Sequence, residues 1–173
     1  RFGIENNSST PLFESVGTDG RLDSVTVYGT TPSGVSGDFC PLVKENNGYM
    51  ANCVNQVNVA ASGNIAGVCL TNKGTVYGSR NEGSLHSSNG NVGGIVYENT
   101  DKGTVRRCIS NQHSDFTGKH VGGLVYRNEG IIHTCAIVLS HQNAEQPWGL
   151  VSYYNNGKIL NTEVSGTVFG IKS

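Results

Sequence analysis

The chain has 173 residues, of which 14% are charged, and its formal net charge is -1. This near-neutral balance, without a basic stripe, excludes a nucleic-acid-binding surface and disfavours disorder. No apolar run approaches the roughly 18 residues that span a membrane, and the 24 glycines, with many Asn and Ser, predict frequent turns and an all-β chain.

The dominant feature of the sequence is an internal repeat of 26–30 residues, present in about six copies. We therefore predict a single domain over residues 1–173, with repeats that start near residues 12, 42, 68, 95, 124 and 150. Phe169-Gly170-Ile171 resembles the start of a seventh unit. The equivalent positions are Leu12, Leu42, Val68, Ile95, Leu124 and Leu150, and the steps between them are 30, 26, 27, 29 and 26 residues.

Each repeat begins with an apolar segment, which is followed by a turn marked by Asn and Gly. Both residue types tolerate left-handed backbone, so we expect a tight turn at these positions. The turn residues that mark it best are Asn72, Gly74, Asn128, Gly130, Asn156 and Gly157.

Two columns of similar residues follow the turn. The residue two positions after the turn glycine is always apolar, and the residue five positions after it is always small. Such columns are typical of stacked coils about 4.8 Å apart, because no single repeat can bury its apolar face alone. The apolar column is Leu22, Met50, Val76, Val105, Ile132 and Ile159; the small column is Val25, Cys53, Ser79, Cys108, Cys135 and Thr162.

These columns predict an all-β solenoid, in the form of a right-handed parallel β-helix of about six coils. Helical repeats are excluded because no segment carries an i, i+3, i+4, i+7 apolar stripe. A propeller is excluded because each blade needs roughly 40 residues or more.

The five cysteines show neither a C-x-x-C motif nor zinc-ligand spacing. Cys53, Cys108 and Cys135 share the small column, so we expect them to be buried free thiols of the structural core. A disulfide between Cys108 and Cys135, or a metal held by the thiols, remains an alternative, and we expect no cofactor.

The candidate binding residues are tyrosines. Tyr97 and Tyr126 occupy equivalent positions, and Tyr153 and Tyr154 lie close to that position in the next copy. If they point outward, they form an aromatic strip that could bind a glycan or a host protein. Packing of these rings into the interior is the alternative.

The sequence offers little for catalysis. Glu45 and Glu98 share a repeat position but are separated by the coil that carries Thr71, about 9.6 Å in total. That spacing is near the upper end for an inverting glycosidase, so a carbohydrate-active enzyme is an open alternative. His133 and Cys135 would need an exposed thiol and an orienting group to form a nucleophilic pair.

The repeat resembles the GLUG motif of bacterial surface proteins. The segment Gly123-Leu124-Val125-Tyr126-Arg127-Asn128-Glu129-Gly130, followed by Cys135, carries the resemblance best. Weaker copies begin at Gly94-Ile95-Val96 and Gly149-Leu150-Val151.

The resemblance implies a secreted or cell-surface bacterial protein in which this chain is a non-catalytic adhesin-like binding module or spacer. It also implies an alternative role as the accessory domain of a large immunoglobulin A peptidase. The chain begins at Arg1 and shows no signal peptide. We therefore expect it to be part of a larger protein and to contact flanking domains of that protein.

Overall fold

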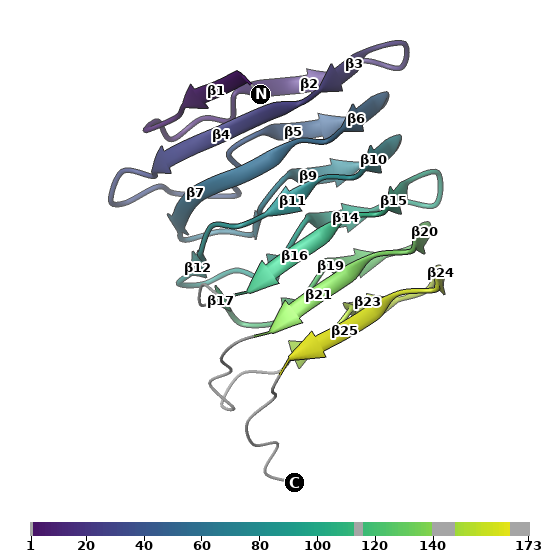
Figure 1. Ribbon diagram of the computed structural model, residues 1–173. Helices are drawn as coiled ribbons and strands as arrows, with labels where there is room; N and C mark the ends of the chain where they lie inside the picture. The colour runs from purple at the N-terminus through teal and green to yellow at the C-terminus, as the bar shows by residue number, and fades with distance from the viewer. Residues whose placement is uncertain (1, 113–115, 140–147, 167–173) are drawn as a thin grey trace, which may run out of the picture.

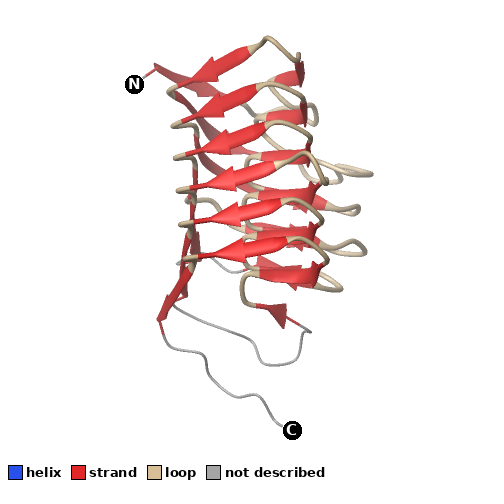
Figure 2. Ribbon diagram, turned by 90° about the vertical axis from the view of Figure 1, so that its right-hand side faces the viewer, coloured by secondary structure: helices blue, strands red, loops and turns tan. Residues whose placement is uncertain are grey.

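The computed structural model describes residues 2–112, 116–139 and 148–166 of the chain. These residues contain 25 short strands and no helix, and the strands pair in parallel between successive coils (Figures 1 and 2). The predicted β-solenoid of about six coils is confirmed. No helix in this part of the chain is long and apolar enough to cross a membrane.

Each complete coil contributes strands to four sheets that run along the solenoid. Sheet 1 contains β1 (Phe2–Glu5), β4 (Val25–Thr30), β7 (Val54–Ala61), β11 (Arg80–Asn81), β16 (Ile109–Gln112), β21 (Ala136–Leu139) and β25 (Glu163–Gly166), with β12 (Leu85–Ser87) and β17 (Phe116–Thr117) on a branch from β7. Sheet 2 contains β2 (Phe13–Val16), β5 (Val43–Asn46), β9 (Cys69–Asn72), β14 (Val96–Asn99), β19 (Val125–Asn128) and β23 (Ser152–Asn155).

The other two sheets complete the wall. Sheet 3 contains β3 (Arg21–Asp23), β6 (Tyr49–Ala51), β10 (Thr75–Tyr77), β15 (Thr104–Arg106), β20 (Ile131–His133) and β24 (Lys158–Leu160). Sheet 4 contains β8 (Ile65–Ala66), β13 (Val92–Gly93), β18 (Val121–Gly122) and β22 (Trp148–Gly149). Phe169-Gly170-Ile171, the expected start of a seventh unit, lies outside the described residues.

The pairing register confirms the repeat alignment except in the last copy. Val125 on β19 pairs with Ser152 on β23, so Val151 and not Leu150 is equivalent to Leu124. The physical reason is that Gly149 pairs with Gly122, which places Leu150 on the outer surface at 40% exposure. Val151 packs against the core in its place.

The two predicted inward columns form the core. In sheet 3 the apolar column pairs in register from Leu22 to Ile159, and its middle members are fully buried. Cys53, Cys108 and Cys135 are buried as predicted, and all five thiols are free. The chain therefore builds its interior from stacked columns of one residue each, which no single coil could bury.

The turns after sheet 2 lie where the sequence placed them, but the left-handed backbone expected there is absent. Asn72 and Asn128 end their strands, while Gly74, Gly130, Asn156 and Gly157 lie in the bends. None of these six residues has a positive φ. Glycine is needed for close approach instead, because a Cβ on Gly74 would lie 2.1 Å from the carbonyl oxygen of Gly48 in the adjacent coil.

The left-handed residues lie at the next corner, between sheets 3 and 1. They stand immediately before the small column, where the chain turns sharply to bring the next strand inward. At this corner one residue in each coil adopts the conformation: Ser24, Asn52, Gly78, Arg107, Thr134 and Asn161, with φ of 59°, 53°, 58°, 53°, 52° and 47°.

The asparagines that end the strands of sheet 2 bond both to the adjoining turn and to one another; Nδ2 of Asn128, for example, donates to the carbonyl oxygen of Gly130 at 3.4 Å. Asn46, Asn72, Asn99 and Asn128 are fully buried. Each Nδ2 donates to the Oδ1 of the Asn in the next coil, and the last acceptor is Asn155, with donor–acceptor distances of 2.7–2.8 Å. We call these five residues the Asn ladder. The ladder satisfies buried amides that would otherwise be costly to bury.

Candidate binding site on sheet 2

Tyr97, Tyr126 and Tyr153 form a stack along the outside of sheet 2. The ring centroids of Tyr97 and Tyr126 are 5.0 Å apart with an interplanar angle of 7°. Those of Tyr126 and Tyr153 are 5.7 Å apart at 8°. The rings lie outside the main core, where Tyr97 packs against a small satellite cluster formed by Cys40, Ala66 and Leu70. We call the three rings the Tyr stack.

A column of glycines in sheet 4 makes room for the Tyr stack. A Cβ on Gly122 would lie 2.0 Å from the carbonyl oxygen of Val125 and 2.7 Å from the Cα of Tyr126. Gly93 and Gly149 meet the equivalent atoms of their own coils at similar distances. The chain therefore folds back sharply between sheets 4 and 2, and the tyrosines follow that corner.

Polar side chains flank the Tyr stack on the other side. The backbone N–H and the side-chain amide of Asn91 both donate to the Oδ1 of Asn64, and Nδ1 of His120 lies 2.9 Å from the Oδ1 of Asn91. The His120 ring contacts Tyr153 at a centroid distance of 4.5 Å. This column was not predicted from the sequence, although each member directly precedes the first residue of a sheet 4 strand.

Within the Tyr stack, neighbouring rings cover each other's faces. Tyr126 is only 8% exposed, and burial, followed by the nearby Tyr97, raises its pKa to about 12. Burial also raises the pKa of Tyr97, against the effect of a hydrogen bond with Asn91. The sequence offered an outward strip or inward packing, and the stack combines the two because the rings are outside the core yet largely covered.

Tyr154 differs from the other three tyrosines. Its ring stands almost perpendicular to Tyr126 and Tyr153, at 85° and 88°, and 52% of the residue is exposed. Among the four candidate tyrosines it is therefore the one that offers substantial free ring surface to a ligand.

A surface hollow of about 430 Å³ lies beside this ring. We call it the sheet 2 hollow. Its charged members are Glu98 and Arg127, which lie opposite each other in the backbone register of β14 and β19. Arg127 lies opposite Tyr154 in the register of β19 and β23. Arg127 donates through Nε and Nη2 to Oε1 of Glu129, at 3.0 and 2.6 Å, which fixes the guanidinium. The lining residues are Tyr97, Glu98, Tyr126, Arg127, Tyr154 and Asn156.

The carboxylates considered for catalysis lie at the predicted spacing, and Glu45 is held by other side chains. Glu45 and Glu98 both pair with Thr71, one coil to either side, as the repeat predicted. Glu45 accepts from Asn47 at 2.8 Å and forms an ion pair with Lys73 at 2.9 Å, and these contacts lower its pKa. A carboxylate held ionised in this way is poorly suited to act as a general acid.

The thiols are buried, which limits their access to a substrate. Burial raises the pKa of Cys108 well above the usual value, whereas a hydrogen bond with Cys108 lowers the pKa of Cys135, a residue only 3% exposed. His133 is engaged with its neighbour, since its Nδ1 lies 2.6 Å from Oγ1 of Thr134. In the described ranges, no group of three or more His, Cys, Asp or Glu side chains is placed to hold a metal ion.

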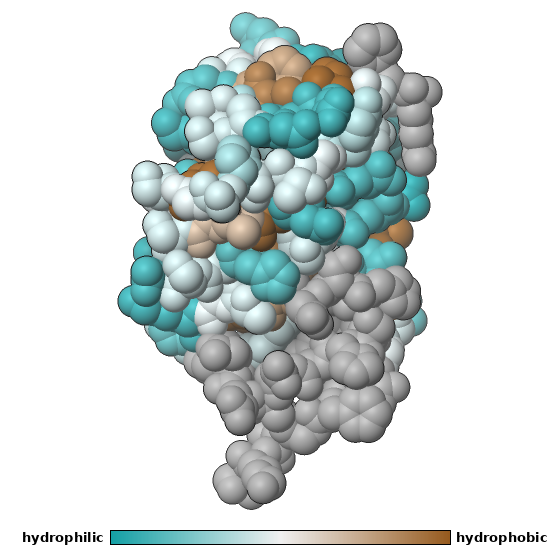
Figure 3. All heavy atoms as spheres, turned by 90° about the vertical axis from the view of Figure 1, so that its left-hand side faces the viewer, coloured by the Kyte–Doolittle hydropathy of each residue, from teal (hydrophilic) through white to brown (hydrophobic). Residues whose placement is uncertain are grey.

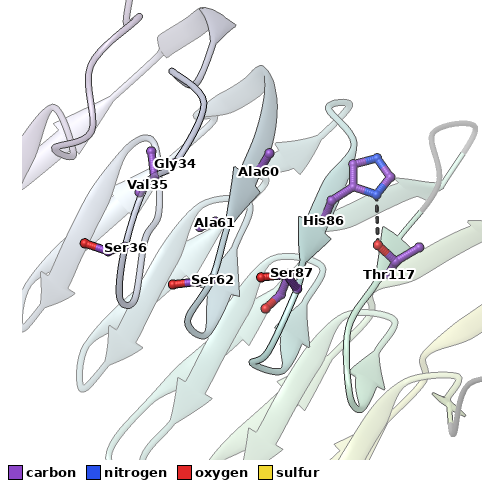
Figure 4. Close-up of a pocket in the computed structure, with 10 residues that line it drawn as sticks. Gly34, Val35, Ser36, Ala60, Ala61, Ser62, His86, Ser87 and Thr117 are labelled. Carbon is purple, nitrogen blue, oxygen red and sulfur yellow. Dashed lines mark hydrogen bonds between the residues drawn. The ribbon is translucent and has the colours of Figure 1, made fainter.

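A second hollow, of about 400 Å³, lies where β7 and β12 run side by side. Gly34, Ala60 and His86 line it, and Nδ1 of His86 lies 2.9 Å from Oγ1 of Thr117 (Figure 4). Ser36 and Ser62 line the opposite rim (Figure 4). The described surface on this side is mostly pale or teal, with a few separate brown patches (Figure 3), and it shows no broad apolar area.

No protein-family model, curated protein or solved structure matches the chain. The resemblance to the GLUG repeat therefore rests on the motif residues themselves.

Proposed function

We propose that this chain is a non-catalytic binding module of a secreted or cell-surface bacterial protein, and that the sheet 2 hollow is its ligand site. The observation that carries the proposal is Tyr154, a half-exposed ring set across the end of the Tyr stack and beside Glu98 and Arg127. Aromatic rings with a polar rim are favoured contact surfaces in binding sites.

The rigid wall around the hollow supports a binding role. Glu98, Arg127 and Tyr154 lie on three successive strands of one parallel sheet, so backbone pairing fixes their spacing at about 4.8 Å per coil. A site on strands is held more precisely than one on a loop and loses less entropy when a ligand binds.

The partner in this proposal is a glycan or a host protein, as in an adhesin, and the resemblance to the GLUG repeat supports a surface location. A spacer role, or a role as accessory domain of an immunoglobulin A peptidase, would leave the hollow without a ligand. A carbohydrate-active enzyme is less favoured, because Glu45 is engaged by Asn47 and Lys73.

The test is binding of the purified chain to an array of glycans and to a panel of extracellular host proteins. We expect at least one ligand, and we expect Tyr154→Ala to weaken its binding. Tyr28→Ala is the matched control, because Tyr28 is 43% exposed on β4 of a different sheet. Absence of binding to both panels would leave the spacer role in place of the proposal.

A further inference from the structure

The side chains of the sheet 2 hollow indicate which class of ligand it binds, and this inference rests on the proposed function. The Tyr154 ring is flat and apolar, makes edge-to-face contacts with the rings of Tyr126 and Tyr153, and is half exposed. A ligand that uses this surface must itself present a flat apolar face. The C–H face of a pyranose ring is such a surface.

The charges of the hollow offset each other. Glu98 and Arg127 are neighbours in one column, and Arg127 is bound to a second carboxylate, that of Glu129. The bond to Glu129 raises the pKa of Arg127, so the guanidinium remains a cation. The two charged side chains that line the hollow, Glu98 and Arg127, sum to zero, so neither a polyanion nor a polycation gains a net attraction from them.

A neutral hydroxylated ligand fits both groups. A ligand hydroxyl can donate to the carboxylate of Glu98 and can accept from the guanidinium of Arg127. A charged ligand group does only one of these, because a carboxylate only accepts and a cation such as ammonium only donates. Hydrogen bonds to ionised groups are also the stronger kind. Glu98 and Tyr154 are two coils apart, about 9.6 Å along the axis, so a ligand that reaches both is longer than one sugar ring.

We propose that the sheet 2 hollow binds a neutral oligosaccharide laid along the solenoid axis. One sugar ring stacks on Tyr154, and hydroxyls of the same chain bond to the carboxylate of Glu98 and the guanidinium of Arg127. The Tyr stack acts as the rigid support that holds the Tyr154 ring upright.

The experiment is calorimetric titration of the folded chain with neutral hexasaccharides of glucose, mannose, galactose, xylose and N-acetylglucosamine. A hexagalacturonate and a chitosan hexamer serve as the anionic and cationic comparisons. We expect a neutral hexasaccharide to bind more tightly than either charged one. Raising NaCl from about 50 mM to about 500 mM should leave that affinity nearly unchanged, because screening acts on charged ligands.

Four variants then test where the ligand binds. Tyr154→Ala should weaken binding about three- to tenfold, the amount expected for one lost ring contact, whereas Tyr154→Phe should keep the affinity. Glu98→Gln should weaken binding without loss of folding, because the side chain is partly exposed. Tyr28→Ala should change nothing.

Several outcomes would overturn the inference. Tighter binding of a charged hexamer, binding of a neutral one that Tyr154→Ala leaves intact, or no hexasaccharide binding at all would each do so. If Tyr154→Ala instead weakens binding of a host protein, the proposed function stands and the neutral sugar falls. If neither carbohydrates nor host proteins bind, both fall together.

Discussion

At the scale of single residues, the Asn ladder shows how this chain makes a polar group acceptable inside a narrow core. Asn99 accepts from Asn72 at 2.7 Å, donates to Asn128 at 2.7 Å and donates to the carbonyl oxygen of Gly103 at 3.2 Å. Removal of the Asn99 amide leaves Oδ1 of Asn128 without its donor and takes one of two acceptors from Nδ2 of Asn72. Buried groups without partners cost more than the bond that held them contributed.

We therefore predict that Asn99→Ala lowers the free energy of unfolding by about 2–5 kcal/mol. Asn155→Ala should cost less than about 1 kcal/mol, since Asn155 is exposed at the end of the ladder. Denaturant titration of both variants measures the difference. Equal losses of unfolding free energy in the two variants would show that the hydrogen bonds of the ladder do not explain the contribution of Asn99 to stability.

The buried thiols lead to a second prediction. Burial raises the pKa of Cys40 to about 12, and burial raises that of Cys69 as well. All five thiols are buried, including Cys135, whose pKa is lowered by a hydrogen bond with Cys108, so iodoacetamide should fail to modify the folded chain at pH 9 and should modify all five cysteines after unfolding. Mass spectrometry counts the adducts, and rapid labelling of the folded chain would contradict the prediction.

These pKa shifts also predict a pH dependence of stability. A thiol whose pKa is raised by folding stabilises the fold fully below the unfolded pKa of about 9 and loses that contribution as the pH rises toward the folded value. Alkaline solution above about pH 9 should therefore weaken the fold.

At the scale of strands and corners, the fold depends on small residues at two kinds of position. The first is the corner between sheets 4 and 2, where Gly93, Gly122 and Gly149 let the chain fold back beside the Tyr stack. In the preceding coil, Ala66 pairs with Gly93, and there Leu70 stands in place of a tyrosine. Glycine at the corner thus accompanies a large ring four residues later.

Gly122→Ala should therefore destabilise the chain by about 3 kcal/mol or more, because the new Cβ would overlap the carbonyl oxygen of Val125. Gly17→Ala is the matched control, because a Cβ on Gly17 meets nothing within 4 Å and its φ is not positive. Thermal unfolding followed by circular dichroism compares them, and a tolerated Gly122→Ala would show that the corner can shift.

The second position is the left-handed corner between sheets 3 and 1. Thr134 has φ of 52° although it is β-branched, whereas Asn52 and Asn161 fill the same position in other coils. Left-handed backbone costs a β-branched residue about 1–2 kcal/mol, and Asn bears it more easily. Thr134→Asn should thus raise the free energy of unfolding by up to about 1 kcal/mol in denaturant titration, while Gly78→Thr, at φ of 58°, should lower it.

The repeated columns were predictable from the sequence, but the direction of every side chain was not. The inward apolar column and the buried cysteines were predictable, because one residue type recurred at one position. The turn beside Asn72 and Asn128 was predictable from Asn-x-Gly, but the amide ladder was not, because it exists only once coils stack. The alignment of the last copy was wrong, because Leu150 resembles a core residue although its pairing with sheet 4 turns it outward.

The candidate site was only partly predictable for the same reason. The sequence placed Tyr97, Tyr126, Tyr153 and Tyr154 near each other, and all four do contact one another or a shared neighbour. Which ring remains exposed depends on the angle of Tyr154 to the stack, and no sequence period encodes that angle. The arrangement of Asn64, Asn91 and His120 beside the stack likewise depends on the fold.

At the scale of the whole molecule, each coil contacts only its two neighbours, so stability should vary along the axis. We predict that hydrogen exchange is slowest in the middle coils, in β9, β10, β14 and β15, and faster in β23, β24 and β25, whose residues are largely exposed. Mass spectrometry of peptic fragments measures this gradient. Uniform protection along the axis would show that the coils unfold as a single unit.

The Asn ladder also gives the solenoid an electrical direction. In every bond the donor amide lies on the coil nearer the N-terminus and the acceptor on the next one. The amide dipoles therefore add head to tail instead of cancelling, and each polarises the next. Val16 occupies the ladder position before Asn46 and ends the row with an apolar side chain. A coil duplicated between β14 and β19 would lengthen this row if it carried Asn, whereas a coil with Val would split it into two shorter dipoles.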